Sequence, residues 1–259
     1  MISSLKDLFF VCNLPISKRM FALIAYAKPK IVMLDDDASF LDVAAYFLEK
    51  HLANEALIAK FPFSTQYINH IQNHCYLHDT SESILRSFYS SDKSQEKVAQ
   101  TLHDLAELPA LLVIDHQLRN EEANGIQISQ KIKEYIPHSF IILLTAEVST
   151  DKALDLHNND VIDLFIRKDA ANPMNVVLKH LNNQIEKIKA AFHFNPEDAF
   201  GFETTLENEH YINCRDDLLY ELDYKSYLTI SACGDIAVLD IDDKTTYYSY
   251  DNKVFSRNG

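Results

Sequence analysis

Basic residues are scarce in this chain of 259 residues, which carries 24 lysines and arginines against 38 aspartates and glutamates, a formal net charge of −14. Such a negative field repels phosphate backbones and anionic lipid headgroups. The composition therefore excludes a protein that coats DNA or membranes non-specifically through charge. It does not by itself say what the acids are for.

Paired cysteines and long apolar runs are also missing. The four cysteines lie far apart and form no CxxC motif, so we expect reduced intracellular thiols. No segment reaches the roughly 18 uninterrupted apolar residues of a membrane span. We interpret residues 1–28 as an N-terminal helical extension, with two short amphipathic helices over Leu5–Tyr26 broken at Asn13-Leu14-Pro15. These features favour a cytoplasmic protein with no membrane partner.

Short apolar runs alternate with helical patterns through the middle of the chain. Unbroken β-branched and leucine runs of this kind are typical of strands buried on both faces of a parallel sheet. The runs are Ile31–Leu34, Ala56–Ala59, Leu111–Ile114, Phe140–Leu144 and Val161–Ile166. Helical spacing follows the first run behind a possible Asp37 cap, recurs over Ile126–Tyr135, and begins again after Asn172-Pro173. This alternation predicts a doubly wound α/β domain over residues 29–193.

Two parts of the chain depart from that alternation. The connection over about residues 64–109 is longer than a crossover needs, and we interpret it as an elaboration of the domain with helices near Thr65–Leu77 and Gln95–Leu108. Residues 194–259 form an acidic region whose alternating pattern predicts a small β-rich meander. From residue 195 onward there are 14 acids and 5 bases, so this region carries −9 of the −14.

Polar side chains stand at the ends of four of the apolar runs. The first run ends in Asp35-Asp36-Asp37, the third in Asp115, the fourth in Thr145 and the fifth in Lys168. In an open parallel sheet the carboxyl ends of the strands line the ligand crevice. Clustered carboxylates suit Mg²⁺, and an ammonium with a hydroxyl suits a phosphoryl group carried by an aspartate. The residues alone therefore predict a site for Mg²⁺ and phosphoryl chemistry.

At this point Lys30–Ala191 resembles the receiver domain of two-component response regulators. The resemblance is carried by the acidic pair Asp35-Asp36, Asp115 after an apolar strand, Asn124-Gly125-Ile126 entering a helix, Leu144-Thr145-Ala146, and Phe165-x-x-Lys168. It implies a flavodoxin-like parallel sheet of five strands in the order 2-1-3-4-5. It covers about 160 residues and says nothing about the flanks.

The resemblance also implies roles for individual residues. Asp115 would accept a phosphoryl group from a histidine kinase or phosphotransfer protein, with Lys168 and Thr145 binding its oxygens. Mg²⁺ would be held by Asp35, Asp36, Asp115 and the backbone carbonyl of Gln117, and Thr145 with Phe165 would form the switch. The protein would then be a non-enzymatic regulator with at most autophosphatase activity. Its further partners would be a downstream protein target and a second copy of the chain, and nucleic acid is not expected.

Departures from the family pattern keep other readings open. Arg119 and Asp169 stand where the family usually has proline, so a pseudo-receiver scaffold that is not phosphorylated is one alternative. Asp35-x-Asp37, Thr145, Lys168 and Gly234-Asp235 would serve a haloacid-dehalogenase-type phosphatase with Asp35 as the nucleophile. A third alternative is a transcriptional regulator, because Asp217–Glu221 followed by Tyr227–Ile230 resembles the core strands of LytTR-type DNA-binding domains.

A histidine-rich segment lies in the long connection. His70, His74 and His78 fall on one helix face, with Cys75 beside them, and such side chains are ligands for borderline metals. Without a second compact ligand pair, we favour a polar helix face over a metal site.

Overall fold

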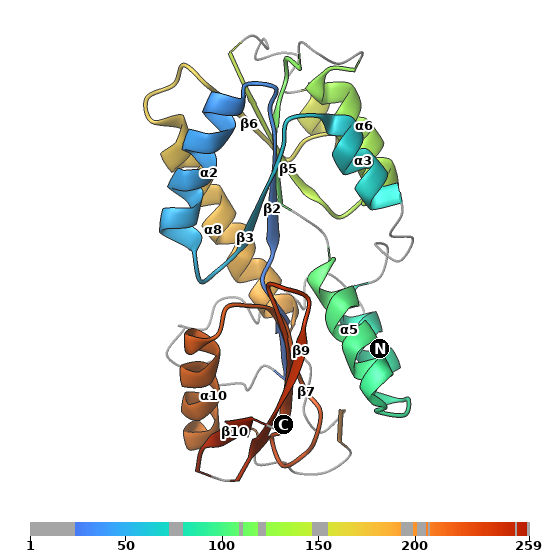
Figure 1. Ribbon diagram of the computed structural model, residues 1–259. Coiled ribbons are helices and arrows are strands. Elements are labelled where there is room, and N and C mark those ends of the chain that lie inside the picture. Colours follow the sequence, from blue (N-terminus) through green and yellow to red (C-terminus); the bar gives the residue numbers. More distant parts are fainter. Residues whose placement is uncertain are drawn as a thin grey trace.

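The computed structural model describes residues 24–72, 80–108, 111–118, 123–146, 155–192, 199–200, 206, 208–251 and 253–257. Two β-sheets divide this part of the chain into two lobes (Figure 1). The parallel-sheet lobe contains β2 to β6 with α2, α3, α6 and α8. The antiparallel-sheet lobe contains β1 and β7 to β10 with α4, α5 and α10.

The parallel-sheet lobe has the strand order β3-β2-β4-β5-β6, with every neighbouring pair parallel. Its strands are β2 (Lys30–Leu34), β3 (Leu57–Phe61), β4 (Leu111–Asp115), β5 (Phe140–Thr145) and β6 (Leu164–Arg167). Numbered within this sheet alone, the order is 2-1-3-4-5, which is the flavodoxin-like order. The predicted fold class is confirmed. The last strand begins later than its apolar run, because the chain is still turning at Asp160, where φ is 56°.

Helices cover both faces of this sheet. α2 (Ala38–Leu52) and α8 (Pro173–Ala191) lie on one face, and α3 (Ser64–Gln72) and α6 (Gly125–Tyr135) on the other (Figure 1). The carboxylate of Asp37 caps α2 as predicted, accepting the N–H groups of Ser39 and Phe40. Asn172 does not cap α8, because its backbone is left-handed rather than extended and its side chain makes no cap hydrogen bond.

The antiparallel-sheet lobe has the order β1-β7-β8-β9-β10, with antiparallel neighbours throughout. Its strands are β1 (Ala25–Ala27), β7 (Tyr224–Thr229), β8 (Ile236–Asp240), β9 (Thr245–Tyr250) and β10 (Phe255–Arg257). The predicted antiparallel sheet near the C-terminal end is confirmed. The prediction of helix for Ala25 and Tyr26 is wrong, because both lie in β1, pair with β7 and are buried. Residues 1–23, where the remaining helices were expected, lie outside the described residues.

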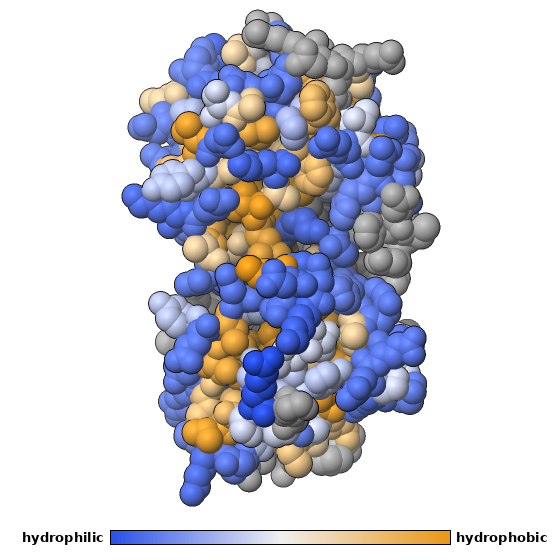
Figure 2. Space-filling view, in the orientation of Figure 1, coloured by the Kyte–Doolittle hydropathy of each residue, from blue (hydrophilic) through white to orange (hydrophobic). Residues whose placement is uncertain are grey.

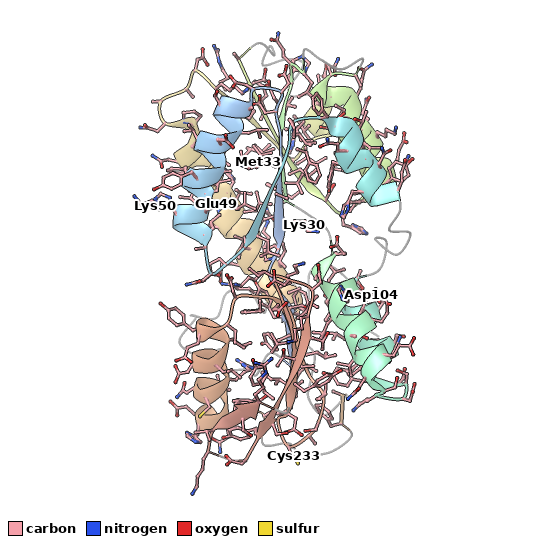
Figure 3. All side chains as sticks on the ribbon, in the orientation of Figure 1. Lys30, Met33, Glu49, Lys50, Asp104 and Cys233 are labelled. Atoms are coloured by element: carbon pink, nitrogen blue, oxygen red, sulfur yellow. The ribbon has the colours of Figure 1, made fainter. Side chains whose placement is uncertain are left out.

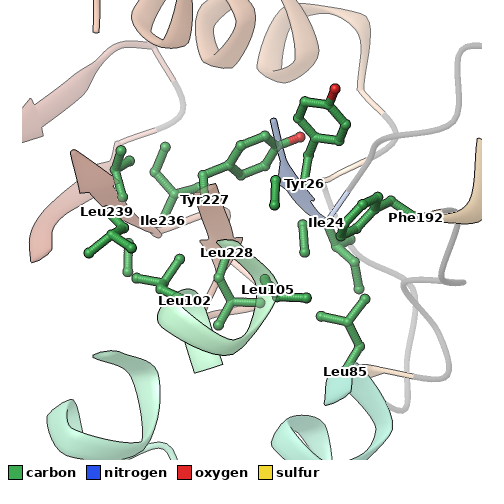
Figure 4. Packing of buried hydrophobic residues seen from close by; sticks show 14 of the residues in the cluster. Ile24, Tyr26, Leu85, Leu102, Leu105, Phe192, Tyr227, Leu228, Ile236 and Leu239 are labelled. Carbon is green, nitrogen blue, oxygen red and sulfur yellow. The ribbon is translucent and has the colours of Figure 1, made fainter. Parts of the chain in front are cut away.

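The long connection contributes helices to both lobes. α4 (Ser81–Tyr89) and α5 (Gln95–Ala106) follow α3 in the chain, yet their buried side chains share one core with β1, β7 and β8 (Figure 4). The hydroxyl of Ser226 in β7 donates to the carbonyl of Leu102 in α5 at 2.8 Å. Interpreting the whole insertion as an elaboration of the parallel-sheet domain is therefore wrong for α4 and α5. One face of the second sheet is buried because these helices pack against it.

α10 (Glu209–Glu221) corrects another expectation. Asp217–Glu221, which resembled a strand of a DNA-binding domain, is the last part of this helix. Tyr211, Arg215 and Leu219 recur every four residues along it and are buried, so the segment reads as one side of an amphipathic helix. The expectation of a strand at Asp217–Glu221 is therefore wrong, whereas Tyr227–Thr229 of the second segment lies in a strand, β7.

The two lobes meet around a cluster of charged side chains. Glu107, which caps the end of α5, accepts from the Lys30 ammonium at 2.7 Å and lies 3.2 Å from Nε2 of His70 in α3. Lys30 lies at the junction of the two lobes in Figure 3. Burial raises the pKa of Glu107, but the hydrogen bond with His70 and the charge of Lys30 outweigh it and bring the pKa down to about 2. The cluster therefore ties the first strand of one sheet to a helix of the other lobe.

Hydrophobic side chains lie mainly in the cores of the two lobes. On the face shown in Figure 2, hydrophilic residues cover the flanking helices, and hydrophobic residues gather between them over the strands. Among the described residues, no helix combines the length and the apolar character needed to cross a bilayer.

Candidate functional site: an acidic edge of the parallel sheet

Four strands of the parallel sheet deliver polar side chains to one edge. Asp35 and Asp36 follow β2, Asp115 ends β4, Thr145 ends β5, and Lys168 follows β6. Parallel neighbours in register end at the same edge, and here Asp115 pairs with Leu144 and Thr145 with Arg167. The structure therefore brings together the polar residues that stand at the ends of separate apolar runs in the sequence.

The Lys168 ammonium lies between two buried carboxylates. Its Nζ is 2.7 Å from Oδ2 of Asp35 and 3.2 Å from Oδ2 of Asp115. The side chains of Asp35 and Asp115 are only 4% and 9% exposed, whereas that of Lys168 is 24% exposed. Water thus screens the carboxylates poorly, and the lysine supplies a large part of their compensation.

Asp115 has an altered acidity. Burial raises its pKa, the charge of Lys168 lowers it, and the neighbouring Asp35 raises it again, and the net pKa lies above its ordinary value. A hydrogen bond from the backbone N–H of Gln117 also favours the charged form. The ionised carboxylate therefore takes up a proton more readily than that of an exposed aspartate.

The acidic residues fit a hard divalent cation. One carboxylate oxygen from each of Asp35, Asp36 and Asp115 lies within 4.8 Å of the other two. Oxygen-only ligand sets of this kind suit Mg²⁺, which prefers one or two carboxylates together with water. Gln117, expected to lend a backbone carbonyl, lies two residues beyond Asp115 and is half-buried.

Thr145 and Phe165 occupy the neighbouring strands. Thr145 is 1% exposed, and its carbonyl accepts the backbone N–H of Lys168 at 2.9 Å. Phe165 lies in β6 opposite Leu143 of β5, half-buried against the core formed with α3 and α6. The lysine that reaches Asp115 is therefore hydrogen-bonded through its backbone to the residue expected to switch.

The turn after Asp115 depends on a glycine. A Cβ atom at Gly125 would lie 2.0 Å from the carbonyl oxygen of Asp115, and the Gly125 N–H donates to the carbonyl of His116 at 2.9 Å. The side chain of Asn124 caps α6 by accepting the N–H groups of Ile126 and Gln127. Because only glycine permits this approach, α6 begins directly against the strand end that carries Asp115. Arg119 lies outside the described residues.

Phe40 belongs to the site although no motif in the sequence marks it. The Lys168 Nζ lies 4.5 Å from the centroid of the Phe40 ring. Helical periodicity marks Phe40 only as a half-buried residue of α2. Its position four residues after Asp36, in the first turn behind the Asp37 cap, was the available signal.

Residues invoked by the alternative readings serve other purposes in the structure. Asp37 caps α2, and Asp235 lies in the antiparallel-sheet lobe, where it bonds to Ser231 and to the N–H of Tyr250. The haloacid-dehalogenase motif is therefore not assembled around Asp35. His70 bonds to Glu107, and His74, Cys75 and His78 lie outside the described residues.

Comparison with known proteins gives likenesses of structure alone. No protein-family model matches the chain, and no curated protein matches its sequence. Most of the solved structures reported as similar to it are response regulators or their receiver domains, at low sequence identity.

Three solved structures illustrate the range. The response regulator LqsR of Legionella pneumophila is 15% identical, with a TM-score of 0.47 over 87% of this chain and 66% of that chain. A receiver domain protein of Methanospirillum hungatei is 14% identical, with a TM-score of 0.40 over 62% of this chain and 97% of that one. An adenylate cyclase of Rhodopirellula baltica is 14% identical, with a TM-score of 0.39 over 75% and 98%. The fold assignment therefore rests on strand order and not on these likenesses.

Proposed function

We propose that the chain is a response regulator of a two-component phosphorelay that accepts a phosphoryl group on Asp115. The observation that carries this proposal is the Lys168 ammonium held 2.7 Å from Asp35 and 3.2 Å from Asp115 at the carboxyl edge of the parallel sheet. A cation placed beside an aspartate nucleophile and a second carboxylate matches what phosphoryl transfer requires, which is mainly positioning and charge compensation.

The residues divide the chemistry between them. A carboxylate oxygen of Asp115 would attack phosphorus, forming an acyl phosphate while the bond from phosphorus to the donor histidine nitrogen breaks. Lys168 and the Thr145 hydroxyl would bind the phosphoryl oxygens. Mg²⁺ held by Asp35, Asp36, Asp115 and the Gln117 carbonyl would offset the negative charge that gathers there. Water would later release phosphate, which limits any enzymatic activity to autophosphatase turnover.

The surface beside the site offers apolar contacts for the phosphoryl donor. Val43 and Tyr46 lie one turn apart on α2, and their side chains are 71% and 68% exposed. Because α2 begins two residues after the acidic pair, this exposed apolar pair is the contact on that helix that we assign to the partner. A histidine kinase or phosphotransfer protein is the partner class that this position and chemistry suit.

The antiparallel-sheet lobe is the proposed output region. Residues 195–259, which include α10 and β7 to β10, carry a net charge of −9, and this opposes the phosphate neutralisation that DNA affinity requires. A downstream protein is therefore the favoured target, reached when the phosphoryl group biases Thr145 and Phe165 between two arrangements.

The test is phosphorylation by a small donor. Wild type and Asp115→Asn, each with Mg²⁺ and acetyl phosphate, are compared by intact mass and by phosphate-retarding gel electrophoresis. We expect one phosphoryl group on wild type, none on Asp115→Asn, and none on wild type after chelation of the metal.

Two outcomes would contradict the proposal. If wild type gains no phosphoryl group at saturating acetyl phosphate, the result would favour a pseudo-receiver scaffold. Label that persists in Asp115→Asn and disappears in Asp35→Asn would favour a phosphatase with Asp35 as the nucleophile. Isothermal titration of the chelator-treated protein with Mg²⁺ measures metal binding separately from the transfer.

A further inference from the structure

The Lys168 side chain needs contacts that restrict it to one conformation, because its four-carbon stem has many rotamers. Lys168 follows the last residue of β6, and its side chain is 24% exposed. The next residue, Asp169, does not hold the Lys168 side chain, because its carboxylate accepts the Nε–H of Arg167 at 2.8 Å.

Phe40 supplies a fixed surface under the ammonium. Its ring centroid lies 4.5 Å from Nζ of Lys168, within the range of a cation–π contact. The ring is itself held, because the Phe40 N–H donates to the Asp37 cap at 3.1 Å and its side chain packs against the α2–α8 core. Helix capping thus fixes the position of the aromatic face.

We propose that Phe40 is a positioning residue that holds the Lys168 ammonium between Asp35 and Asp115, ready for a phosphoryl oxygen. This inference rests on the proposed function of the site. A lysine ammonium has three N–H donors, and in the described part of the chain its contacts are two carboxylates and one ring. The ring attracts the charge without accepting a hydrogen bond along a lone pair, so one donor remains for the incoming oxygen. A carboxylate in place of Phe40 would engage that donor.

The test compares three substitutions on one helix. Phe40→Leu keeps an apolar side chain and removes the aromatic face, whereas Phe40→Tyr keeps that face. Phe47→Leu is the matched control, because Phe47 lies two turns further along α2, is half-buried against the same core, and has its ring beside His51 rather than Lys168.

The first readout is the initial rate of Asp115 phosphorylation by acetyl phosphate with saturating Mg²⁺, measured across donor concentrations. We expect Phe40→Leu to be slower by about three- to tenfold, the range of one partly desolvated cation–π contact. Phe40→Tyr and Phe47→Leu should stay within about twofold of wild type. Equal slowing by Phe40→Leu and Phe47→Leu would assign the effect to packing and overturn the proposal.

The second readout observes the contact directly. The ε-methylene protons of Lys168 should show an upfield ring-current shift in NMR spectra of wild type and Phe40→Tyr, and this shift should be absent in Phe40→Leu. An unchanged shift in Phe40→Leu would overturn the proposal even if the rates differed.

Failure of the proposed function and failure of this inference give different results. Without the function, wild type itself carries no label on Asp115. Without the positioning role, wild type is labelled and Phe40→Leu is labelled at the same rate.

Discussion

Replacing Lys168 with methionine tests how the acidic edge is stabilised. The substitution keeps the apolar stem of the side chain and removes the ammonium that lies 2.7 Å from Asp35 and 3.2 Å from Asp115. Both carboxylates are more than nine-tenths buried and would lose their main compensating charge. The folded state should therefore become less stable than that of wild type in the absence of a divalent cation.

The magnitude follows from the burial of the three groups. Removing one partner of a buried ion pair costs about 3–5 kcal/mol, and the partial exposure of Lys168 places the expected loss at the lower end, about 3 kcal/mol. For a chain of this size the melting temperature should fall by about 6–12 °C. The pKa of Asp115 is raised in the folded protein, so its contribution to stability is present at low pH and is lost as the pH rises through the folded pKa. In wild type, the Lys168 charge limits this loss of stability at higher pH. The difference in free energy of unfolding between wild type and Lys168→Met should therefore be largest near neutral pH and become smaller on acidification.

The assay is urea unfolding of wild type, Lys168→Met and Lys168→Arg at several pH values, with chelator or with Mg²⁺. Lys168→Arg keeps the positive charge and should recover most of the stability. Mg²⁺ should stabilise Lys168→Met more than wild type, because the cation replaces the missing charge. A deficit of the same size at acidic and neutral pH, unaffected by Mg²⁺, would refute the electrostatic reasoning.

Three further predictions concern the rest of the chain. Gly125→Ala places a Cβ 2.0 Å from the Asp115 carbonyl and should cost about 1–3 kcal/mol in urea unfolding, with Asn124→Ala costing about 1 kcal/mol as the capping control. Phe88→Ala, in α4, should cost about 3–5 kcal/mol, because this ring is fully buried in the core of the antiparallel-sheet lobe. The loss should lower the urea concentration at the unfolding midpoint, followed by tyrosine fluorescence. The stability that Glu107 contributes is present above its unfolded pKa and lost as the pH falls toward about 2, so Glu107→Gln should flatten the acid limb of the stability profile.

The sequence predicts the parallel-sheet lobe well because its signals are local. β2, β4 and β5 are buried along almost their whole length, so each appears as an unbroken apolar run. The edge strand β3 is only half-buried, and its boundaries shift by one residue at the start and two at the end from the predicted run. The end of β6 was predictable because Lys168 follows it, whereas its beginning depends on a turn that apolar content does not reveal.

The antiparallel-sheet lobe could not be assembled from the sequence in the same way. Its core combines β1, the helices α4 and α5 from the long connection, and the strands after residue 223. Nothing in the local pattern of α5 states which sheet it covers, because an amphipathic helix of its length fits either lobe. Ala25–Ala27 is three residues long, too short for alternation to distinguish strand from helix.

The residues of the candidate site also differ in whether the sequence could predict them. The carboxylates and the lysine could be selected because chemistry restricts which residues gather at a sheet edge. Phe40 could not be selected, because a half-buried aromatic residue in an amphipathic helix has an ordinary structural explanation. Its contact with Lys168 depends on where two segments 128 positions apart meet, which only the tertiary structure provides.

Two segments of the chain connect the acidic edge of the parallel sheet with the core of the antiparallel-sheet lobe. β1 runs through Lys28-Pro29 directly into β2, the strand that ends at the acidic pair, and the Lys28 N–H continues the hydrogen bonding to β7 by donating to Lys225. α8 begins a few residues beyond Lys168, and the side chain of Phe192, just past its end, is buried in the other core against Tyr26. Chain segments that position the site therefore also build the antiparallel-sheet lobe. If Asp115 is phosphorylated as proposed, a shift at Lys168 would have two packed routes to that lobe, through β2 into β1 and through α8 to Phe192.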